Sequence, residues 1–157
     1  MCRVIVMGAC PHDDHAQSSN WGIFNQHIWG DYNQHSQDRP QGLRPRFNSC
    51  AEELCISDVV LYELLYGAER SSDPVHTRRE VEHFAARLAV LPFDSEAAAH
   101  TADIRAALER NGRIIDPYDL MIAGHARSRG LIVVTGNLRE FQRVEGLRTE
   151  DWLTDTV

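Results

Sequence analysis

The stretch Leu131-Ile132-Val133-Val134-Thr135 decides the fold class of this chain. It is a continuous apolar run with two adjacent valines, and such a run suits a strand that is buried on both faces. Strands of this kind lie in the middle of parallel sheets, where helices cover both faces. We therefore predict a central parallel strand at 131–135.

On both sides of this strand, helical patterns alternate with short apolar runs from residue 54 onward. Further strands are expected at 54–56, 89–91 and 147–149, and a short helical turn at 137–141. Each expected helix begins at a side chain that can cap it. The helices run from Ser57 to before Gly67, from Asp73, from Asp94 or Ser95 to near Gly112, and from Asp116 to Gly130. This alternation predicts a three-layer α/β/α fold around a mostly parallel sheet.

Length and composition limit the functional classes. A chain of 157 residues with 43% hydrophobic and 25% charged side chains is typical of a single globular domain. No apolar run approaches the roughly 18 residues that cross a bilayer, so a cytoplasmic protein without membrane contact is expected. The formal charge of −7 argues against a general nucleic-acid coat, but an enzyme that holds Mg²⁺ needs clustered carboxylates.

The first 37 residues differ from the rest. Residues 3–7 are apolar enough for a strand, but 11–37 are polar and show no helical or strand period. Residues 21–27 recur as 29–35, eight residues later, which indicates duplicated or out-of-frame DNA or, alternatively, an aromatic binding element. We divide the chain into an atypical segment, 1–37, and a domain, 38–157, and expect 11–37 to contribute little stability.

Glu63 is the first candidate site residue, inside the helix predicted after Ser57. The helix is apolar on the turns on either side, and a carboxylate in such surroundings is costly unless it is paired or bound to a cation. The plainer alternative is a glutamate at the edge of the apolar stripe, solvated or paired with an arginine. The sequence pattern leaves both interpretations open.

An aspartate and an asparagine, Asp119 and Asn137, are the other candidates, and a second aspartate stands close to the first. Asp116 precedes Pro117 and is well explained as a helix cap. Asp119 lies beside an apolar helix face, so we expect it at the carboxyl ends of the strands, where open α/β sheets bind ligands. Asn137 follows the strand at 131–135 and is expected at the same edge, with a simple turn residue as the alternative.

Together, Glu63, Asp119 and Asn137 have the oxygen ligands that a hard cation prefers. If they share one Mg²⁺, or Mn²⁺ in its place, their side-chain oxygens should lie roughly 4 to 7 Å apart. Thr135 is placed to hydrogen-bond around such a site. The three residues together are therefore a candidate site for one hard cation bound through oxygen.

Four motifs in this order resemble the PIN-domain family and, more narrowly, the VapC toxins. They are Ile56-Ser57-Asp58-Val59-Val60-Leu61-Tyr62-Glu63-Leu64-Leu65-Tyr66-Gly67-Ala68-Glu69, Val90-Leu91-Pro92-Phe93-Asp94, Ile115-Asp116-Pro117-Tyr118-Asp119-Leu120-Met121-Ile122-Ala123-Gly124-His125-Ala126 and Val133-Val134-Thr135-Gly136-Asn137-Leu138-Arg139-Glu140-Phe141. The similarity extends over about residues 38–157.

The resemblance implies the toxin of a type II toxin–antitoxin system, a metal-dependent endoribonuclease whose close relatives cut initiator tRNA. It implies a VapB-like antitoxin as partner, RNA as substrate and a homodimer. By motif position, Glu63 and Asp119 are metal ligands. Asn137 takes the fourth acidic position, where relatives often carry Asn or Asp, and would position water or metal.

The chain departs from this family at its start. Family members begin with a strand that ends in Asp-Thr-Asn, and that aspartate is a principal metal ligand. Here residues 3–7 are followed by Gly8, Ala9 and Cys10, which suggests a replaced or frameshifted start. Asp13 or Asp14 is a candidate replacement, although nothing in the spacing shows it. The alternative function is therefore an impaired toxin that binds its antitoxin without cutting RNA.

A third interpretation concerns the cysteines and histidines near the start. Cys10, His12, Asp13 and His15 form a candidate zinc site, although four ligands within six residues do not easily close on one tetrahedral ion. The cysteines at 2, 10, 50 and 55 have no paired CxxC spacing, so neither a disulfide framework nor a four-thiolate zinc site is expected.

Overall fold

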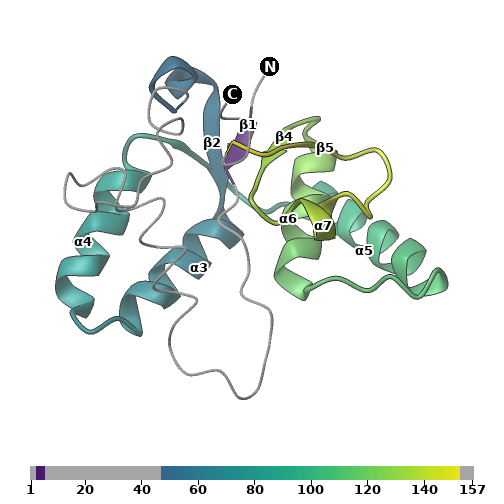
Figure 1. Ribbon diagram of the computed structural model, residues 1–157, viewed down its shortest axis with the longest axis horizontal. Helices are drawn as coiled ribbons and strands as arrows, with labels where there is room; N and C mark the ends of the chain where they lie inside the picture. Colours follow the sequence, from purple (N-terminus) through teal and green to yellow (C-terminus); the bar gives the residue numbers. More distant parts are fainter. Residues whose placement is uncertain (1–2, 6–46, 153–157) are drawn as a thin grey trace.

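The computed structural model describes residues 3–5 and 47–152, drawn as coloured ribbon in Figure 1. The predictions for residues 6–46, including the candidate zinc ligands and the low stability contribution of 11–37, lie outside the described residues. Among those described, no helix is both long and apolar enough to span a membrane.

A five-stranded parallel sheet forms the centre of the molecule. Its strands are β1 (Arg3–Ile5), β2 (Leu54–Ser57), β3 (Ala89–Leu91), β4 (Ile132–Val134) and β5 (Arg148–Glu150), in the order β3-β2-β1-β4-β5. All four pairings are parallel, and Val4 is in register with Cys55 on one side and Val133 on the other. The predicted interior position of the apolar run at 131–135 is confirmed, because β4 is fully buried between β1 and β5.

The helices are α3 (Asp58–Glu69), α4 (Pro74–Ala85), α5 (Ser95–Arg110), α6 (Pro117–Ser128) and the short α7 (Leu138–Phe141), with a 3-10 turn at Ala51–Glu53. Helices α3 and α4 pack together, as do α5 and α6. Figure 1 shows the two pairs on either side of β1 and β2 in that view. The predicted α/β fold is confirmed.

The predicted caps and terminators account for most helix ends. The side chains of Asp73, Asp94 and Asp116 accept hydrogen bonds from backbone N–H groups in the first turn of α4, α5 and α6. Gly112 and Gly130 follow α5 and α6 with φ of 61° and 64°, the left-handed conformation that glycine adopts without strain.

Several predicted boundaries were wrong, by one residue at the strands Leu54–Ser57 and Ile132–Val134 and at two further places. Helix α3 continues through Gly67 to Glu69, because Gly67 is buried in the packed part of the helix and tertiary contacts outweigh its low helix propensity. The last strand is Arg148–Glu150, one residue later than predicted, since its pairing with β4 sets its position.

The topology brings several chain segments to one edge of the sheet. Because the strands are parallel, the carboxyl ends of β2 and β4 lie at the same edge, at Ser57 and at Thr135 just after Val134. Helix α3 leaves β2 at this edge. Helix α6 starts there too, because its carboxyl end at Ser128 leads back to the start of β4. The second turn of α3 meets the first turn of α6 at Tyr62 and Tyr118, and Ser57 at the start of α3 meets His125 in the last turn of α6.

Candidate metal centre

Asp119 lies in the first turn of α6 and is completely buried. Its Oδ2 accepts a hydrogen bond from Asn137 Nδ2 across 3.3 Å, whereas its Oδ1 has no hydrogen-bond partner in the described part of the chain. A buried carboxylate oxygen without a donor is costly, and this one is available to a cation. The predicted proximity of Asp119 and Asn137 is observed.

Asn137 reaches Asp119 because the chain turns sharply after β4. The buried Thr135 Oγ1 accepts a hydrogen bond from the backbone N–H of Asn137, at 2.9 Å. The N–H of Thr135 in turn donates to the carbonyl of Glu150 on β5, at 3.0 Å. Thr135 therefore positions Asn137, the supporting role that the sequence suggested. Asn137 stands before α7, but its side chain does not cap that helix.

Glu63 lies in the second turn of α3 and is half-buried, with its Oε2 buried and without a hydrogen-bond partner among the described residues. Burial, and after it the negative charges of Asp119 and Asp116, raise the pKa of Glu63 to about 8. Glu63 on α3 and Asp119 on α6 are therefore close enough in space for their charges to interact. An arginine partner, the plainer alternative, is not found for Glu63 among the described residues.

Burial also raises the pKa of Asp119, to about 7. The charges of Asp116 and Glu140 act in the same direction, and the hydrogen bond from Asn137 opposes them. Without a cation, the ionised forms of both carboxyl groups are therefore disfavoured near neutral pH. A divalent ion supplies the charge that would let both ionise, and carboxylate oxygens are the ligands that Mg²⁺ and Mn²⁺ prefer.

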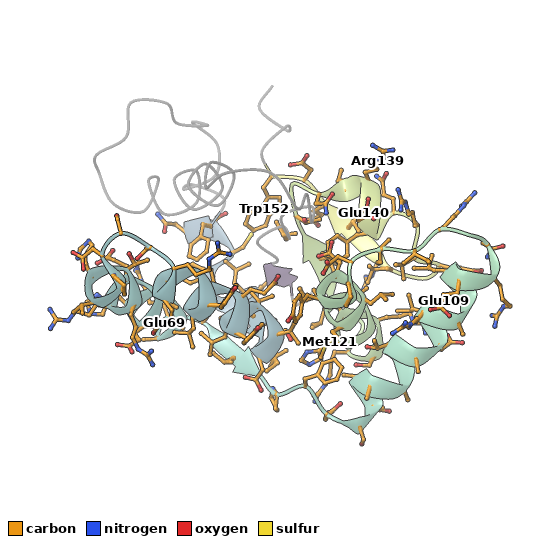
Figure 2. The ribbon with its side chains drawn as sticks, turned by 90° about the horizontal axis from the view of Figure 1, so that it is seen from below. Glu69, Glu109, Met121, Arg139, Glu140 and Trp152 are labelled. Carbon is orange, nitrogen blue, oxygen red and sulfur yellow. The ribbon has the colours of Figure 1, made fainter. Side chains whose placement is uncertain are left out.

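Asp116 and Glu140 were not among the predicted site residues. Asp116 caps α6 as predicted, with its Oδ1 accepting from Tyr118 N at 2.8 Å, but its charge also acts on both Glu63 and Asp119. Glu140 lies on α7, labelled in Figure 2. The sequence did contain a signal for the effect of Asp116, because Asp116 and Asp119 are three residues apart at a helix start.

The described part of the site offers only two carboxylates, those of Glu63 and Asp119, as candidate metal ligands. No group of three or more His, Cys, Asp or Glu side chains within residues 47–152 is arranged to hold a metal ion. Glu63, Asp119 and the neutral Asn137 fit a hard cation in ligand type, but a third anionic ligand would have to come from outside them. The residues after β1, where the sequence lacks the expected aspartate, lie outside the described residues.

Beneath the site, a buried hydrogen bond connects its two helices. His125 Nδ1 in α6 is 2.9 Å from the hydroxyl of Ser57, the residue that caps α3 by accepting from Val59 N at 3.2 Å. The ring of Phe93 packs edge-on to His125, with centroids 5.8 Å apart. Burial lowers the pKa of His125, which keeps the imidazole neutral. This contact holds α6 against the start of α3.

Residues 28–147 match the PIN domain family. The chain is 55% identical over 116 residues to a tRNA(fMet)-specific endonuclease VapC of Shigella flexneri, covering 74% of this chain and 88% of that protein. It is 45% identical to Ribonuclease VapC2 of Haemophilus influenzae over 115 residues, 73% of this chain and 87% of the relative.

Solved structures give the same result. The chain resembles a chain in the crystal structure of DNA-bound VapBC from Salmonella typhimurium with a TM-score of 0.74 and 43% identity. The similarity covers 97% of this chain and 99% of that one. With the parallel sheet and with Asp119 and Asn137 in contact at its edge, these relationships show that the chain belongs to the PIN-domain family, among its VapC toxins.

Proposed function

We propose that this chain is the toxin of a type II toxin–antitoxin system and acts as a Mg²⁺-dependent endoribonuclease that hydrolyses phosphodiester bonds of tRNA. The observation that carries the proposal is the pair of buried carboxylate oxygens, Glu63 Oε2 and Asp119 Oδ1, which lack donors among the described residues and belong to groups whose charges interact. The names of the VapC relatives support the ribonuclease activity and the tRNA substrate.

Each site residue has a distinct role in this proposal. Glu63 and Asp119 would hold the cation through oxygen, and Asn137 orients Asp119 through its hydrogen bond. When bound, Mg²⁺ would supply an activated water and offset charge on the leaving oxygen. Asp116 and Glu140 add negative charge that favours cation binding. A tRNA substrate implies action in the cytoplasm.

The solved VapBC complexes support a VapB-like antitoxin as the partner that holds the toxin inactive, and we expect a homodimer as its assembly. A second candidate function follows from the departure at the start of the chain. With two carboxylates and one neutral amide in the described site, an impaired toxin that binds its antitoxin without cutting RNA is the alternative.

The purified chain should be incubated with tRNA in Mg²⁺ and in EDTA. We expect slow cleavage that requires the metal and disappears in Asp119→Asn. Glu109→Gln is the matched control, because Glu109 is an exposed carboxylate on α5, away from α3 in Figure 2, paired with Arg105. Cleavage in EDTA contradicts the proposal. Antitoxin binding with no cleavage at all favours the second candidate.

A further inference from the structure

Three tyrosines, Tyr66, Tyr62 and Tyr118, form a continuous row on the surface, here called the tyrosine row. Tyr66 and Tyr62 are one turn apart on α3, with ring centroids 6.2 Å apart and planes only 11° from parallel. Tyr62 then meets Tyr118 of α6, with centroids 5.5 Å apart and hydroxyl oxygens 3.3 Å apart. The row therefore bridges the two helices that carry Glu63 and Asp119.

The tyrosine row is exposed although it is aromatic. Tyr62, Tyr66 and Tyr118 are 48%, 47% and 38% exposed, and they are three of the five large hydrophobic side chains exposed in the described part of the chain. By contrast, the aromatic side chains of the core, such as Phe84 and Phe141, are buried. Apolar side chains gathered on a surface mark a binding site more often than scattered ones.

The tyrosine row runs from the candidate metal centre along α3. Tyr62 and Tyr118 immediately precede Glu63 and Asp119 in the sequence, and their contact joins the two helices that carry these carboxylates. The row therefore lies on the surface that borders the candidate metal centre, within reach of the part of a substrate next to its reacting group.

A shallow, open hollow beside the row has the shape and the mostly apolar lining that suit a flat, uncharged group. It is lined by Leu61 and Leu65 and by the rings of Tyr62 and Tyr66, with the carboxylates of Asp58 and Glu69 also at its wall. These carboxylates repel a phosphate but not a neutral ring. Phosphate binding is better suited to the far end of the row, where the guanidinium of Arg70 lies 5.7 Å from the ring centre of Tyr66.

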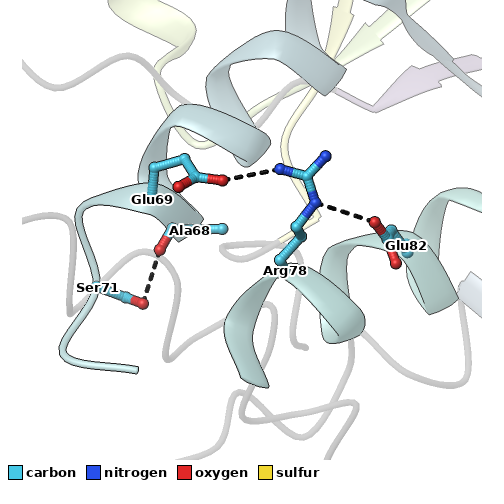
Figure 3. Close-up of polar contacts among 5 residues, drawn as sticks. All are labelled: Ala68, Glu69, Ser71, Arg78 and Glu82. Carbon is cyan, nitrogen blue, oxygen red and sulfur yellow. Dashed lines mark hydrogen bonds and ion pairs between the residues drawn. The ribbon is translucent and has the colours of Figure 1, made fainter. Parts of the chain in front are cut away.

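The side chain of Glu69, at the wall of this hollow, is held by an ion pair with helix α4. Arg78 of α4 donates through Nη1 to Glu69 at 2.8 Å and through Nε to Glu82 at 3.1 Å, as Figure 3 shows. Glu69 is therefore engaged with α4, and Arg70, the next residue, is the cation that remains over the row.

We propose that the tyrosine row stacks the unpaired bases beside the scissile phosphate of an RNA strand, with Arg70 contacting the next phosphate. The inference rests on the proposed ribonuclease function and names how its substrate is held. Aromatic side chains stack on bases of any sequence, but only on bases that are not stacked in a duplex. The row would therefore select single-stranded loops. It also supplies affinity that a chain of charge −7 does not obtain from electrostatics alone.

The test measures binding of the full chain to a fluorescent single-stranded oligoribonucleotide of about ten nucleotides, in Ca²⁺ so that no cleavage interferes. Tyr66→Leu and Tyr62→Leu should each raise Kd roughly 5- to 100-fold, because they remove a stacking surface. Tyr66→Phe keeps the ring and should stay within about twofold of the parent chain. Equal melting temperatures of the three variants and the parent show that the fold is intact.

Salt dependence separates the two parts of the proposal. The Kd ratio of Tyr66→Leu to the parent should be the same at about 50 and 200 mM salt, since stacking involves no counterion release. Arg70→Gln should instead lower the slope of log Kd against log salt by about one.

Each other result is decisive. If the leucine variants bind RNA like the parent but lose self-association or antitoxin binding, the row is a protein interface and the inference is wrong, while the proposed function stands. If they bind like the parent and lose nothing, the inference is also wrong. If the parent and Glu63→Gln both fail to bind any RNA, the proposed ribonuclease function falls, and the inference with it.

Discussion

The side-chain amide of Asn137 donates a hydrogen bond to Asp119, with 3.3 Å between Nδ2 and Oδ2. This contact joins the end of β4 to the start of α6, and it lowers the pKa of an aspartate that burial and two neighbouring acids raise. A neutral donor in this position thus favours the ionised form of Asp119, the form that a cation needs.

Asn137→Ala should therefore raise the pKa of Asp119 above its value of about 7 and weaken Mg²⁺ binding near neutral pH, because protons compete better for the site. Calorimetric titration with Mg²⁺ at several pH values measures this. Asn111→Ala is the control, since that amide donates only to a helix carbonyl, Ala107 O, at the exposed end of α5. Unchanged Mg²⁺ affinity in Asn137→Ala would show that Asn137 does not contribute to the metal site.

The raised pKa values of Glu63 and Asp119 predict an unusual pH dependence of stability. Both values, about 8 and about 7, lie above the ordinary 4.5 and 3.8, so the metal-free folded state binds more protons than the unfolded state between these limits. The contribution of these groups to stability is therefore greatest at low pH and falls as pH rises through the folded pKa values.

Glu63→Gln removes this ionisable group and with it the pH-dependent contribution of Glu63 to stability. The difference in melting temperature, variant minus parent, should therefore increase from about pH 5 to about pH 8, by roughly 2–4 °C for each kcal/mol of stability that the parent loses as Glu63 ionises. Thermal unfolding in EDTA measures this difference. Burial lowers the pKa of His125, so this residue makes a contribution to stability that rises with pH. That contribution is the same in the variant and the parent and cancels in the difference between their melting temperatures. A difference that shrinks as pH rises would show that Glu63 is not buried as an acid.

Repair of the N-terminal segment should raise activity. Replacing residues 1–37 with a strand that ends in Asp-Thr-Asn puts a carboxylate at the end of the strand that takes the place of β1, between β2 and β4. Loss of a direct metal ligand should cost at least as much as loss of a supporting residue, about 10- to 100-fold in affinity or activity. The repaired chain should therefore gain Mg²⁺-dependent tRNA cleavage and arrest growth.

Asp119→Asn in the repaired chain should abolish both the cleavage and the growth arrest. If instead the unrepaired chain already cuts tRNA at the repaired rate, the site is complete as it stands. Asp13 and Asp14 then become the first substitutions to make.

Gly124 sets the distance between α5 and α6. A Cβ atom built there would lie 2.0 Å from Thr101 Oγ1 and 2.6 Å from the backbone N of Thr101, and the backbone atom has no room to move. Helix propensity alone predicts that Gly124→Ala stabilises α6 by about 1 kcal/mol. We expect the opposite, a loss of about 1–3 kcal/mol from overpacking.

Urea unfolding measures the sign of this change. Thr101→Ala in the Gly124→Ala background is the informative control, compared with Thr101→Ala alone, because it removes the Oγ1 contact but leaves the backbone clash and should not restore stability. A net gain in stability from Gly124→Ala would mean that α5 and α6 can separate at this contact.

The sequence by itself determined the local structure and the family. The starts of α4, α5 and α6 were predicted from Asp73, Asp94 and Asp116, because capping is decided by residues within one turn. The buried strand β4 was predicted from its continuous apolar run. The predicted end of helix α3 at Gly67 was wrong, because a buried helix is stabilised mainly by packing rather than by helix propensity.

Only the tertiary structure decided the strand order β3-β2-β1-β4-β5 and the electrostatics of the site. The pKa values of Glu63 and Asp119 depend on burial and on charges that are close in space but distant along the chain, such as Asp116 beside Glu63. The contact of Tyr62 with Tyr118 has the same origin. Desolvation and Coulomb energies follow distances in the folded molecule, which residue spacing does not contain.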